Sequence, residues 1–268
     1  MTSGDRAPKA TTAADAPGPD RAPEATTAAD ASRPNRAPEA KAEPAAAAPR
    51  LDRARAALIL VDLQPDFMPG GALAVPAGDE VIAPCNRLAA AGRFGIVVAT
   101  QDWHPAGHIS FASSHPGRRP FQIIDLYGRA QVLWPDHCLQ GSPGAALHAA
   151  FDAARAELVL RKGADPLVDS YSAFRSNWNA NGKRPPTGLA QFLRQRGARA
   201  VVLAGLARDY CVLWSAEDAA AAGFDTIVAW DATRPVDAAS DDATRAALAA
   251  AGVRALDCAE ILRAEDCP

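Results

Sequence analysis

Five short apolar runs recur along the chain, and they are rich in valine, leucine and isoleucine. A strand that is buried on both faces of a sheet reads as a continuous apolar run of this length. A strand with one face in water alternates instead between apolar and polar residues. We therefore predict that the runs are the buried strands of one mostly parallel sheet: Ala56–Val61, Gly95–Thr100, Glu157–Leu160, Ala200–Gly205 and Thr226–Trp230.

Longer segments of helical character separate these runs, and a glycine closely follows each expected helix. Glycine is common just past a helix C-terminus because it adopts a left-handed conformation without strain. Strands that alternate with helices predict a three-layer α/β/α sandwich. The expected helices are Glu80–Ala91, Gly188–Gln195, Tyr210–Ala222 and Asp237–Ala251, followed by Gly92, Gly197, Gly223 and Gly252.

The first 50 residues of the 268-residue chain differ in composition from the rest. They contain no leucine, isoleucine, valine, phenylalanine, tyrosine or tryptophan, and the segment Asp5–Asp15 recurs with one change at Asp20–Asp30. Such a segment buries too little apolar surface to offset the entropy of ordering its backbone. We expect residues 1–50 to be a disordered repeat tail and residues 51–268 to form one domain.

The overall charge and the cysteines disfavour several classes of protein. A formal net charge of −3 argues against nucleic acid as the main partner. The five cysteines are widely spaced and form no Cys-x-x-Cys pair, which is typical of neither a disulfide scaffold nor a thiolate zinc site. No run reaches the roughly 18 apolar residues of a membrane span. We expect a soluble cytoplasmic protein without a membrane partner, and whether it forms a homo-oligomer is left open.

Four chemically complementary side chains lie at or just beyond the ends of four different predicted strands. They are Asp62, Asp102, Lys162 and Cys211. Open parallel α/β sheets bind their ligands outside the carboxyl ends of the strands. We therefore expect these four groups to converge on one rim of the sheet.

The segment Gly205–Val212 places a cysteine where a thiol can be catalytic. The thiol of Cys211 is predicted to stand in the first turn of the helix that follows the strand. Exposed backbone N–H groups there stabilise a thiolate and lower the pKa of the thiol. The same N–H groups can bind the oxyanion of a tetrahedral intermediate. The competing interpretation is a small buried apolar residue, the usual role of a free cysteine.

Asp62 and Lys162 favour the catalytic interpretation of Cys211. A thiol that attacks an amide needs a base to accept its proton and an acid to protonate the departing ammonia. A partly buried carboxylate serves in both roles, and a neighbouring ammonium keeps it ionised until substrate arrives. For either residue taken alone, an ordinary salt bridge at a strand end is the competing explanation.

One carboxylate and two histidines predict a site for a divalent metal ion. Asp102 and His104 are two residues apart, so both side chains point the same way in an extended segment. With His137 they form a ligand set suited to Zn, Fe or Mn. His108 is left open, because it can ligate the same ion, bind substrate or stabilise the loop. Surface or structural roles are expected for the two remaining histidines, His115 and His148.

Five motifs in this order resemble the nicotinamidase/pyrazinamidase branch of the isochorismatase-like cysteine hydrolases. The resemblance extends from Ala56 to Asp257. It implies the three-layer sandwich with a mostly parallel sheet and an amidase that contains a metal ion. The motifs are Val61–Phe67 with Gly70–Gly71, Asp102–Pro105, Trp134–Cys138, Lys162–Gly163 and Gly205–Val212.

The resemblance also implies a role for each matching residue. Cys211 would be the nucleophile, Asp62 the general acid and base, and Lys162 the third member of the triad. The ion, with zinc first and iron or manganese as alternatives, would meet the pyridine nitrogen of the substrate. The other implied roles are metal ligands at Asp102, His104 and His137, ring contacts at Phe67, Trp134 and Tyr171, an oxyanion hole at the N–H groups of Ala207 and Cys211, and a cis peptide at Leu206–Ala207.

The implied reaction is hydrolysis of nicotinamide to nicotinate and ammonia through a cysteine thioester, in NAD salvage, with pyrazinamide as a side substrate. The alternatives are a sibling hydrolase acting on a carbamoyl or ureido compound, a non-haem iron oxygenase and a catalytically silent interaction protein. The predicted metal ligands and aromatic residues disfavour the sibling hydrolase. The predicted catalytic triad disfavours both the oxygenase and the interaction protein. Arg208 departs from the family pattern, in which a small or neutral residue is usual. Its effect on the pocket rim is left open, and it touches none of the implied catalytic roles.

Overall fold

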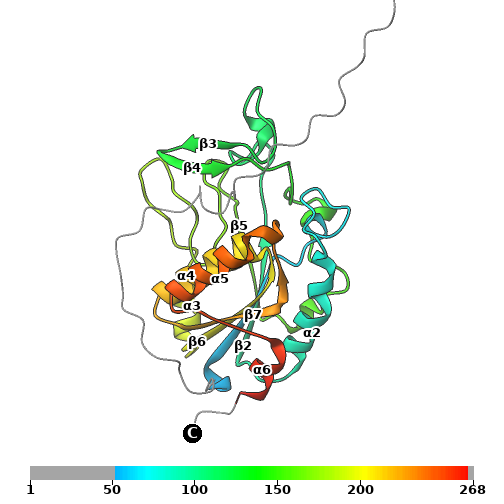
Figure 1. The fold of residues 1–268 in the computed structure, drawn as a ribbon, viewed down its shortest axis with the longest axis vertical. Helices are drawn as coiled ribbons and strands as arrows, with labels where there is room; N and C mark the ends of the chain where they lie inside the picture. Colours follow the sequence, from blue (N-terminus) through cyan, green and yellow to red (C-terminus); the bar gives the residue numbers. More distant parts are fainter. Residues whose placement is uncertain (1–51, 265–268) are drawn as a thin grey trace, which may run out of the picture.

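A computed structural model describes residues 52–264 and contains one six-stranded parallel sheet in the order β5-β2-β1-β6-β7-β8 (Figure 1). The five predicted strands are all present, and β1 is buried along its whole length. The prediction of a mostly parallel sheet is confirmed. The strands are β1 (Ala56–Val61), β2 (Ile96–Asp102), β5 (Leu158–Lys162), β6 (Ala200–Leu206), β7 (Asp225–Arg234) and β8 (Arg254–Leu256).

Helices cover both faces of the sheet, which makes the predicted three layers. The chain leaves β1 toward β2 in one direction and leaves β6 toward β7 in the other. Because crossovers between parallel strands are right-handed, the helices of the two halves lie on opposite faces. One layer contains α2 (Ile82–Ala90) and α6 (Cys258–Arg263), and the other contains α3 (Leu189–Gln195), α4 (Leu213–Ala221) and α5 (Asp241–Ala250).

Short helical turns connect these elements. A π-helical turn, η7 (Arg208–Val212), precedes α4 where the sequence predicted the first turn of an ordinary helix. Such turns inside helices are frequent at functional sites. The 3-10 turns are η1 (Arg53–Arg55), η2 (Pro65–Phe67), η3 (Gly78–Val81), η4 (Ala112–Ser114), η5 (Pro143–Ala145), η6 (Ala153–Arg155) and η8 (Ala238–Ser240).

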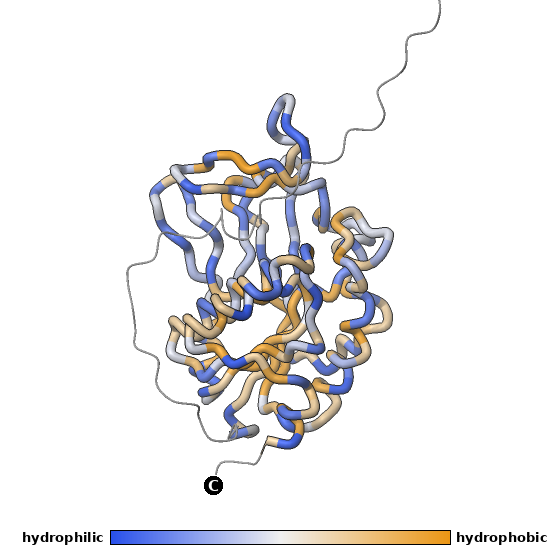
Figure 2. The backbone as a smooth tube through the Cα atoms, in the orientation of Figure 1, coloured by the Kyte–Doolittle hydropathy of each residue, from blue (hydrophilic) through white to orange (hydrophobic). Residues whose placement is uncertain are grey.

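The fold contains a hairpin, a strand and a helix that were not predicted from the sequence. The long segment between β2 and β5 contains an antiparallel hairpin of β3 (Ile123–Leu126) and β4 (Arg129–Val132), which lies at the top of Figure 1. Strand β3 alternates between exposed and half-buried residues, and β4 begins with exposed and half-buried polar and small residues before it becomes buried at Gln131 and Val132, so neither strand is a continuous apolar run. Figure 2 shows that apolar residues line the central strands of the sheet. The other missed elements are the three-residue β8 and the short helix α6.

The boundaries of the expected domain extend slightly beyond the described residues. The repeat tail at residues 1–50 lies outside them, as do Leu51 and residues 265–268, which include Cys267. Within residues 52–264, no helix combines the length and the apolar character needed to cross a membrane.

Gly205 allows β1 and β6 to approach each other closely near their carboxyl ends, where Asp62 and Cys211 follow. Its φ angle is 110°, and a Cβ atom at this position would lie 2.1 Å from the carbonyl oxygen of Val61. The pairing of β6 with β7 is also irregular between Leu203 and Gly205. Any larger residue would therefore push β6 away from β1 at the carboxyl ends of both strands.

We predict that Gly205→Ala lowers the free energy of unfolding by about 3 kcal/mol, because the new methyl group adds overpacking to backbone strain. The matched control is Gly223→Ala. Gly223 also has a positive φ angle, of 87°, but open space surrounds its Cβ position. Strain alone should cost this control about 1 kcal/mol. Urea denaturation measures both, and equal losses would show that the close approach to Val61 is unimportant.

Candidate active site

The site lies at the point in the sheet where the connections after two adjacent strands lead in opposite directions. In the strand order, β1 and β6 are neighbours, and the chain leaves them toward opposite edges of the sheet. Such a switch point opens a crevice at the carboxyl ends of the strands. Asp62 follows β1 and Cys211 lies in the turn after β6, so the two groups flank this crevice. Asp102 and Lys162 are paired in register at the ends of β2 and β5.

The ammonium group of Lys162 contacts the other three groups that were predicted to converge, those of Asp62, Asp102 and Cys211. Its Nζ atom lies 2.8 Å from Oδ2 of Asp62 and 2.6 Å from Oδ1 of Asp102. It also lies 3.4 Å from Sγ of Cys211 and donates a hydrogen bond of 3.2 Å to the carbonyl of Ser170. A carboxylate oxygen of Asp62 and the sulfur of Cys211 lie within 4.8 Å of each other. The structure thus brings the acid, the amine and the thiol together.

Hydrogen bonds from neighbouring side chains hold Asp62 and the backbone of Asp102 in place. Oδ1 of Asp62 accepts a hydrogen bond of 2.6 Å from the Thr100 hydroxyl, and the Asp62 amide donates back to that hydroxyl. The side-chain amide of Gln64 accepts from the N–H of Asp102 and donates to its carbonyl, both at 2.8 Å. Thr100 therefore holds the carboxylate of Asp62 directly, whereas Gln64 holds the backbone that carries the side chain of Asp102.

The two carboxylates differ in their affinity for protons. Burial raises the pKa of Asp62, and the attraction of Lys162 offsets this only in part. Burial also opposes the ionisation of Asp102, but there the attraction of Lys162 and His104 holds the pKa well below its usual range. Although burial disfavours a charged Lys162, Asp102 and Asp62 together raise its pKa well above that of a free lysine. The site thus contains a fixed cation, a fixed anion and a carboxylate suited to proton transfer.

The expected lowering of the Cys211 pKa is wrong for the site without substrate. Burial raises the pKa of this thiol well above its usual range, and the opposing attraction of Lys162 is weaker. The expected lowering depended on exposed N–H groups at a helix N-terminus, whereas all five residues of η7 are buried. Cys211 therefore needs a base to remove its proton, and Asp62 is within reach.

The expected cis peptide is present between Leu206 and Ala207. It lies immediately before η7, so Ala207 is the residue at the junction of strand and turn. Ala207 and Cys211 both line the pocket. This places the two residues of the predicted oxyanion hole against the same cavity as the thiol.

Three predicted metal ligands form a compact group. Nε2 of His104 lies 3.4 Å and Nε2 of His137 lies 3.6 Å from Oδ2 of Asp102. Nδ1 of His104 lies 2.9 Å from the carbonyl of Gly163, and Nδ1 of His137 lies 2.8 Å from the carbonyl of Pro135. Because a carbonyl can only accept, each Nδ1 carries a hydrogen, and each Nε2 is the ring nitrogen that faces Asp102. The donor set fits a divalent cation.

His108 lies beside this group but faces a different set of partners. Its ring is 4.2 Å from that of His104, and its Nδ1 atom lies 2.8 Å from the Ser110 hydroxyl. Ligand atoms of His104, His108 and Asp169 all lie within 4.8 Å of one another, whereas His108 is absent from the cluster around Asp102. The structure therefore leaves the fourth ligand open.

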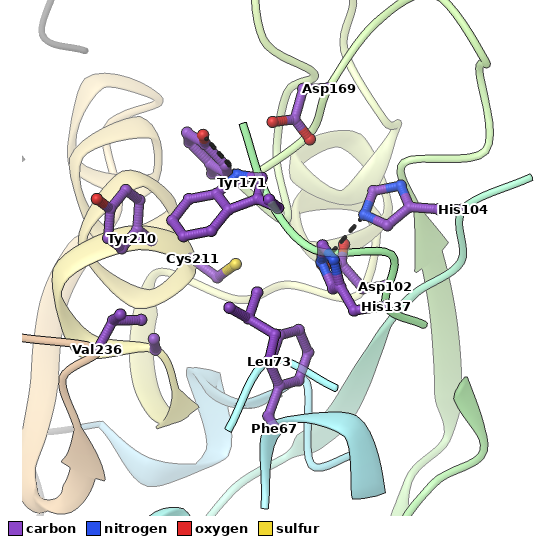
Figure 3. A pocket seen from close by; sticks show the side chains of 12 residues that line it. Phe67, Leu73, Asp102, His104, His137, Asp169, Tyr171, Tyr210, Cys211 and Val236 are labelled. Carbon is purple, nitrogen blue, oxygen red and sulfur yellow. Dashed lines mark hydrogen bonds and ion pairs between the residues drawn. The ribbon is translucent and has the colours of Figure 1, made fainter. Parts of the chain in front are cut away.

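Aromatic side chains enclose the space above the thiol. Nε1 of Trp134 donates a hydrogen bond of 3.1 Å to the hydroxyl of Tyr171, and the Tyr210 ring lies edge-on to Trp134 at 4.8 Å. Phe67 lies on the opposite side of the pocket, and the sulfur of Cys211 points into the enclosed space (Figure 3). The lining residues are Phe67, Leu73, Asp102, His104, Trp134, His137, Asp169, Tyr171, Ala207, Tyr210, Cys211 and Val236.

Four lining residues were not identified from the sequence: Leu73, Asp169, Tyr210 and Val236. Tyr210 is next to Cys211 in the motif, and Asp169 is two residues before Tyr171, so their positions carried a usable signal. Leu73 and Val236 are single apolar residues in connecting segments, and nothing local distinguishes them.

Sequence comparison identifies relatives of known activity. Residues 56–265 match the family model described as Isochorismatase domain. The chain is 47% identical to a nicotinamidase of Acinetobacter baylyi over 181 residues, which are 68% of this chain and 82% of the relative. It is 45% identical to a nicotinamidase of Escherichia coli over 192 residues, or 71% of this chain and 88% of the relative.

Solved structures resemble the fold over nearly their whole length. A nicotinamidase/pyrazinamidase of Acinetobacter baumanii has a TM-score of 0.73 and 42% identity, covering 77% of this chain and 98% of its own. PnC1 from L. infantum in complex with nicotinate has a TM-score of 0.68 and 39% identity, covering 80% and 98%. A pyrazinamidase of Pyrococcus horikoshii in complex with zinc has a TM-score of 0.59 and 31% identity, covering 76% and 99%.

The matched segment includes every strand of the sheet and all the groups that converge on its rim. The chain therefore belongs to the isochorismatase family.

Proposed function

We propose that the chain hydrolyses nicotinamide to nicotinate and ammonia, and that it also deamidates pyrazinamide. The observation that carries this proposal is the contact of one buried ammonium, that of Lys162, with Asp62, Asp102 and Cys211 beneath an aromatic pocket. Relatives named nicotinamidase and a related structure with bound nicotinate support the choice of substrate. NAD salvage in the cytoplasm is the setting we propose.

In the first half of the reaction, Asp62 accepts the thiol proton as the sulfur of Cys211 attacks the carboxamide carbon. The carbonyl oxygen becomes an oxyanion that accepts hydrogen bonds from the N–H groups of Ala207 and Cys211. When the oxyanion collapses, the carbon–nitrogen bond breaks and Asp62 returns its proton to the departing ammonia. The product on the enzyme is a thioester of Cys211.

In the second half, Asp62 accepts a proton from water as the water oxygen attacks the thioester carbon. Collapse of this second tetrahedral species breaks the carbon–sulfur bond, and the sulfur recovers a proton from Asp62. The product is the carboxylic acid, which releases its proton to solvent and leaves as nicotinate, and Cys211 is again a thiol. Lys162 stays charged throughout, because both neighbouring carboxylates raise its pKa.

The residues that would hold the metal ion are Asp102, His104 and His137. A bound divalent ion supplies a Lewis acid that can hold the ring nitrogen of the substrate. We propose zinc, which the Pyrococcus horikoshii relative contains, with iron and manganese as alternatives suited to the same ligands. The hydrogen bonds from Nδ1 of both histidines to backbone carbonyls fix the ring orientations that this binding needs.

Aromatic contacts would orient the substrate ring. Phe67 and Trp134 line the pocket from different segments, and Tyr171 is held by Trp134. Stacking on these side chains, together with the metal ligands, favours a planar heteroaromatic amide over a carbamoyl or ureido compound. An oxygenase using the same ligands would leave the contact between Lys162 and Cys211 without a role.

We expect Cys211→Ala to reduce ammonia release from nicotinamide by at least about 1,000-fold, because it removes the nucleophile. Cys258→Ala is the matched control, since Cys258 is also buried but does not line the pocket. It should retain wild-type turnover. A sample treated with a chelator should also lose activity and recover it when zinc is restored.

The outcomes distinguish the rival functions. Full activity of Cys211→Ala with loss on chelation would favour the oxygenase. Release of ammonia from N-carbamoyl compounds, with none from nicotinamide, would favour the sibling hydrolase. If no amide is turned over and no thiol reagent selectively labels Cys211, the results would favour a catalytically silent interaction protein.

The pH dependence of turnover tests the role of Asp62. As pH falls through the raised pKa of Asp62, the base becomes protonated and kcat/KM declines. Thr100→Val removes the hydrogen bond that stabilises the ionised carboxylate, so the acidic limb should move to higher pH. Thr226→Val is the control, because that buried hydroxyl donates to the carbonyl of Phe224 instead. An identical acidic limb in all three proteins would contradict this assignment.

A further inference from the structure

The structure places the Arg208 side chain, whose effect the sequence left open, outside the pocket. The residue lies in η7 between Ala207 and Cys211, but its side chain does not line the pocket. It is 5% exposed and points to β7 and the start of α5. The side chain therefore does not form the pocket rim, and a buried guanidinium three residues before the nucleophile needs another explanation.

The guanidinium of Arg208 is held on all its edges. Nε donates to the Thr233 hydroxyl at 2.8 Å, and one terminal nitrogen contacts both carboxylate oxygens of Asp241 at 2.7 Å. The other terminal nitrogen donates to the carbonyls of Thr233 at 2.7 Å and Trp230 at 3.2 Å. The plane of the group also lies 3.9 Å from the centre of the Trp230 ring. A planar fork with partners in several directions has almost no freedom to rotate.

The next residue anchors the same turn to the same part of the chain. The carboxylate of Asp209 accepts hydrogen bonds from the amides of Val236 at 2.9 Å and Asp237 at 3.0 Å, and from the Ser240 hydroxyl at 3.1 Å. Val236 also lines the pocket. Two consecutive residues of η7 therefore join the turn of the nucleophile to the connection between β7 and α5.

We propose that Arg208 is a positioning residue that sets the placement of the Cys211 sulfur and of the N–H groups at Ala207 and Cys211. It touches neither substrate nor the reacting atoms and acts through the backbone of η7. Its importance for turnover rests on the proposed amidase function. A displacement of about 1 Å in a reacting group can reduce turnover about 100-fold, so a rigid anchor at this position matters for catalysis.

The test compares Arg208→Met with Arg254→Met. Arg254 on β8 contacts both carboxylate oxygens of Asp225 at 2.8 Å, so the control also removes a two-oxygen Arg–Asp contact, at the far end of β7. For Arg208→Met we expect kcat on nicotinamide to fall about 10- to 100-fold while KM changes less than about 3-fold. Arg254→Met should keep the wild-type values of both.

A second readout needs no amide substrate. Iodoacetamide labelling of Cys211, followed by peptide mass spectrometry across pH, reports the placement of the sulfur relative to Lys162 and Asp62. We expect Arg208→Met to label more slowly and to show a displaced pH profile. Arg208→Lys keeps the ion pair with Asp241 but lacks the fork, so its kcat should lie between those of Arg208→Met and the wild type.

If Arg208→Met does not fold, Asp241→Asn weakens the same anchor and keeps Arg208 in place. Its kcat should fall about 3- to 10-fold, with slower labelling of Cys211. Wild-type kcat and labelling in the folded variants would overturn the proposal, as would a loss of kcat matched by an equal loss of folded protein. If the wild type turns over no amide, the labelling profile alone decides the role of Arg208.

Discussion

The active site depends on one buried ammonium group. Lys162 would be costly to bury alone, as would Asp62 and Asp102, but together they neutralise much of each other's charge. The arrangement also separates the chemistry of the two acids. Asp102 is held ionised for a cation, whereas Asp62 keeps a raised pKa that suits proton transfer to and from Cys211. Two similar carboxylates thus gain different roles from their surroundings.

The sheet supplies the geometry that this charge cluster needs. Because β1 and β6 are adjacent and the chain leaves them toward opposite edges of the sheet, the residues after them face a common crevice. Gly205 lets the two strands approach closely at that end, and the π-helical turn then directs Cys211 toward Lys162. Arg208 contacts Asp241 at the start of α5, and Asp209 accepts a hydrogen bond from Val236, so both residues connect this turn to the segment that leads into α5.

The strands could be predicted because each buried strand is a continuous apolar run in the sequence. The place of the polar groups could be predicted because the residues that follow parallel strands lie at the same edge of the sheet. Asp62, Asp102, Lys162 and Cys211 were expected on one rim and lie there. The hairpin β3–β4 escaped prediction because its half-exposed strands lack an apolar run. The rest depended on distant contacts. Burial raises the pKa of Cys211 where a lowered pKa was expected. The side chain of Arg208 points toward β7. Leu73 and Val236 line the pocket only because the tertiary fold brings their segments there.

The most direct test of the account is the protonation of Asp62, measured by carbon-13 NMR of its carboxyl group as pH is varied. Comparison with the spectrum of Asp62→Asn assigns the signal. Removing the ammonium in Lys162→Met deletes the main influence that lowers this pKa, so the account predicts that Asp62 titrates at a higher pH than in the wild type. A titration that is unchanged in the folded variant would contradict the claim that Lys162 controls the charge of the site.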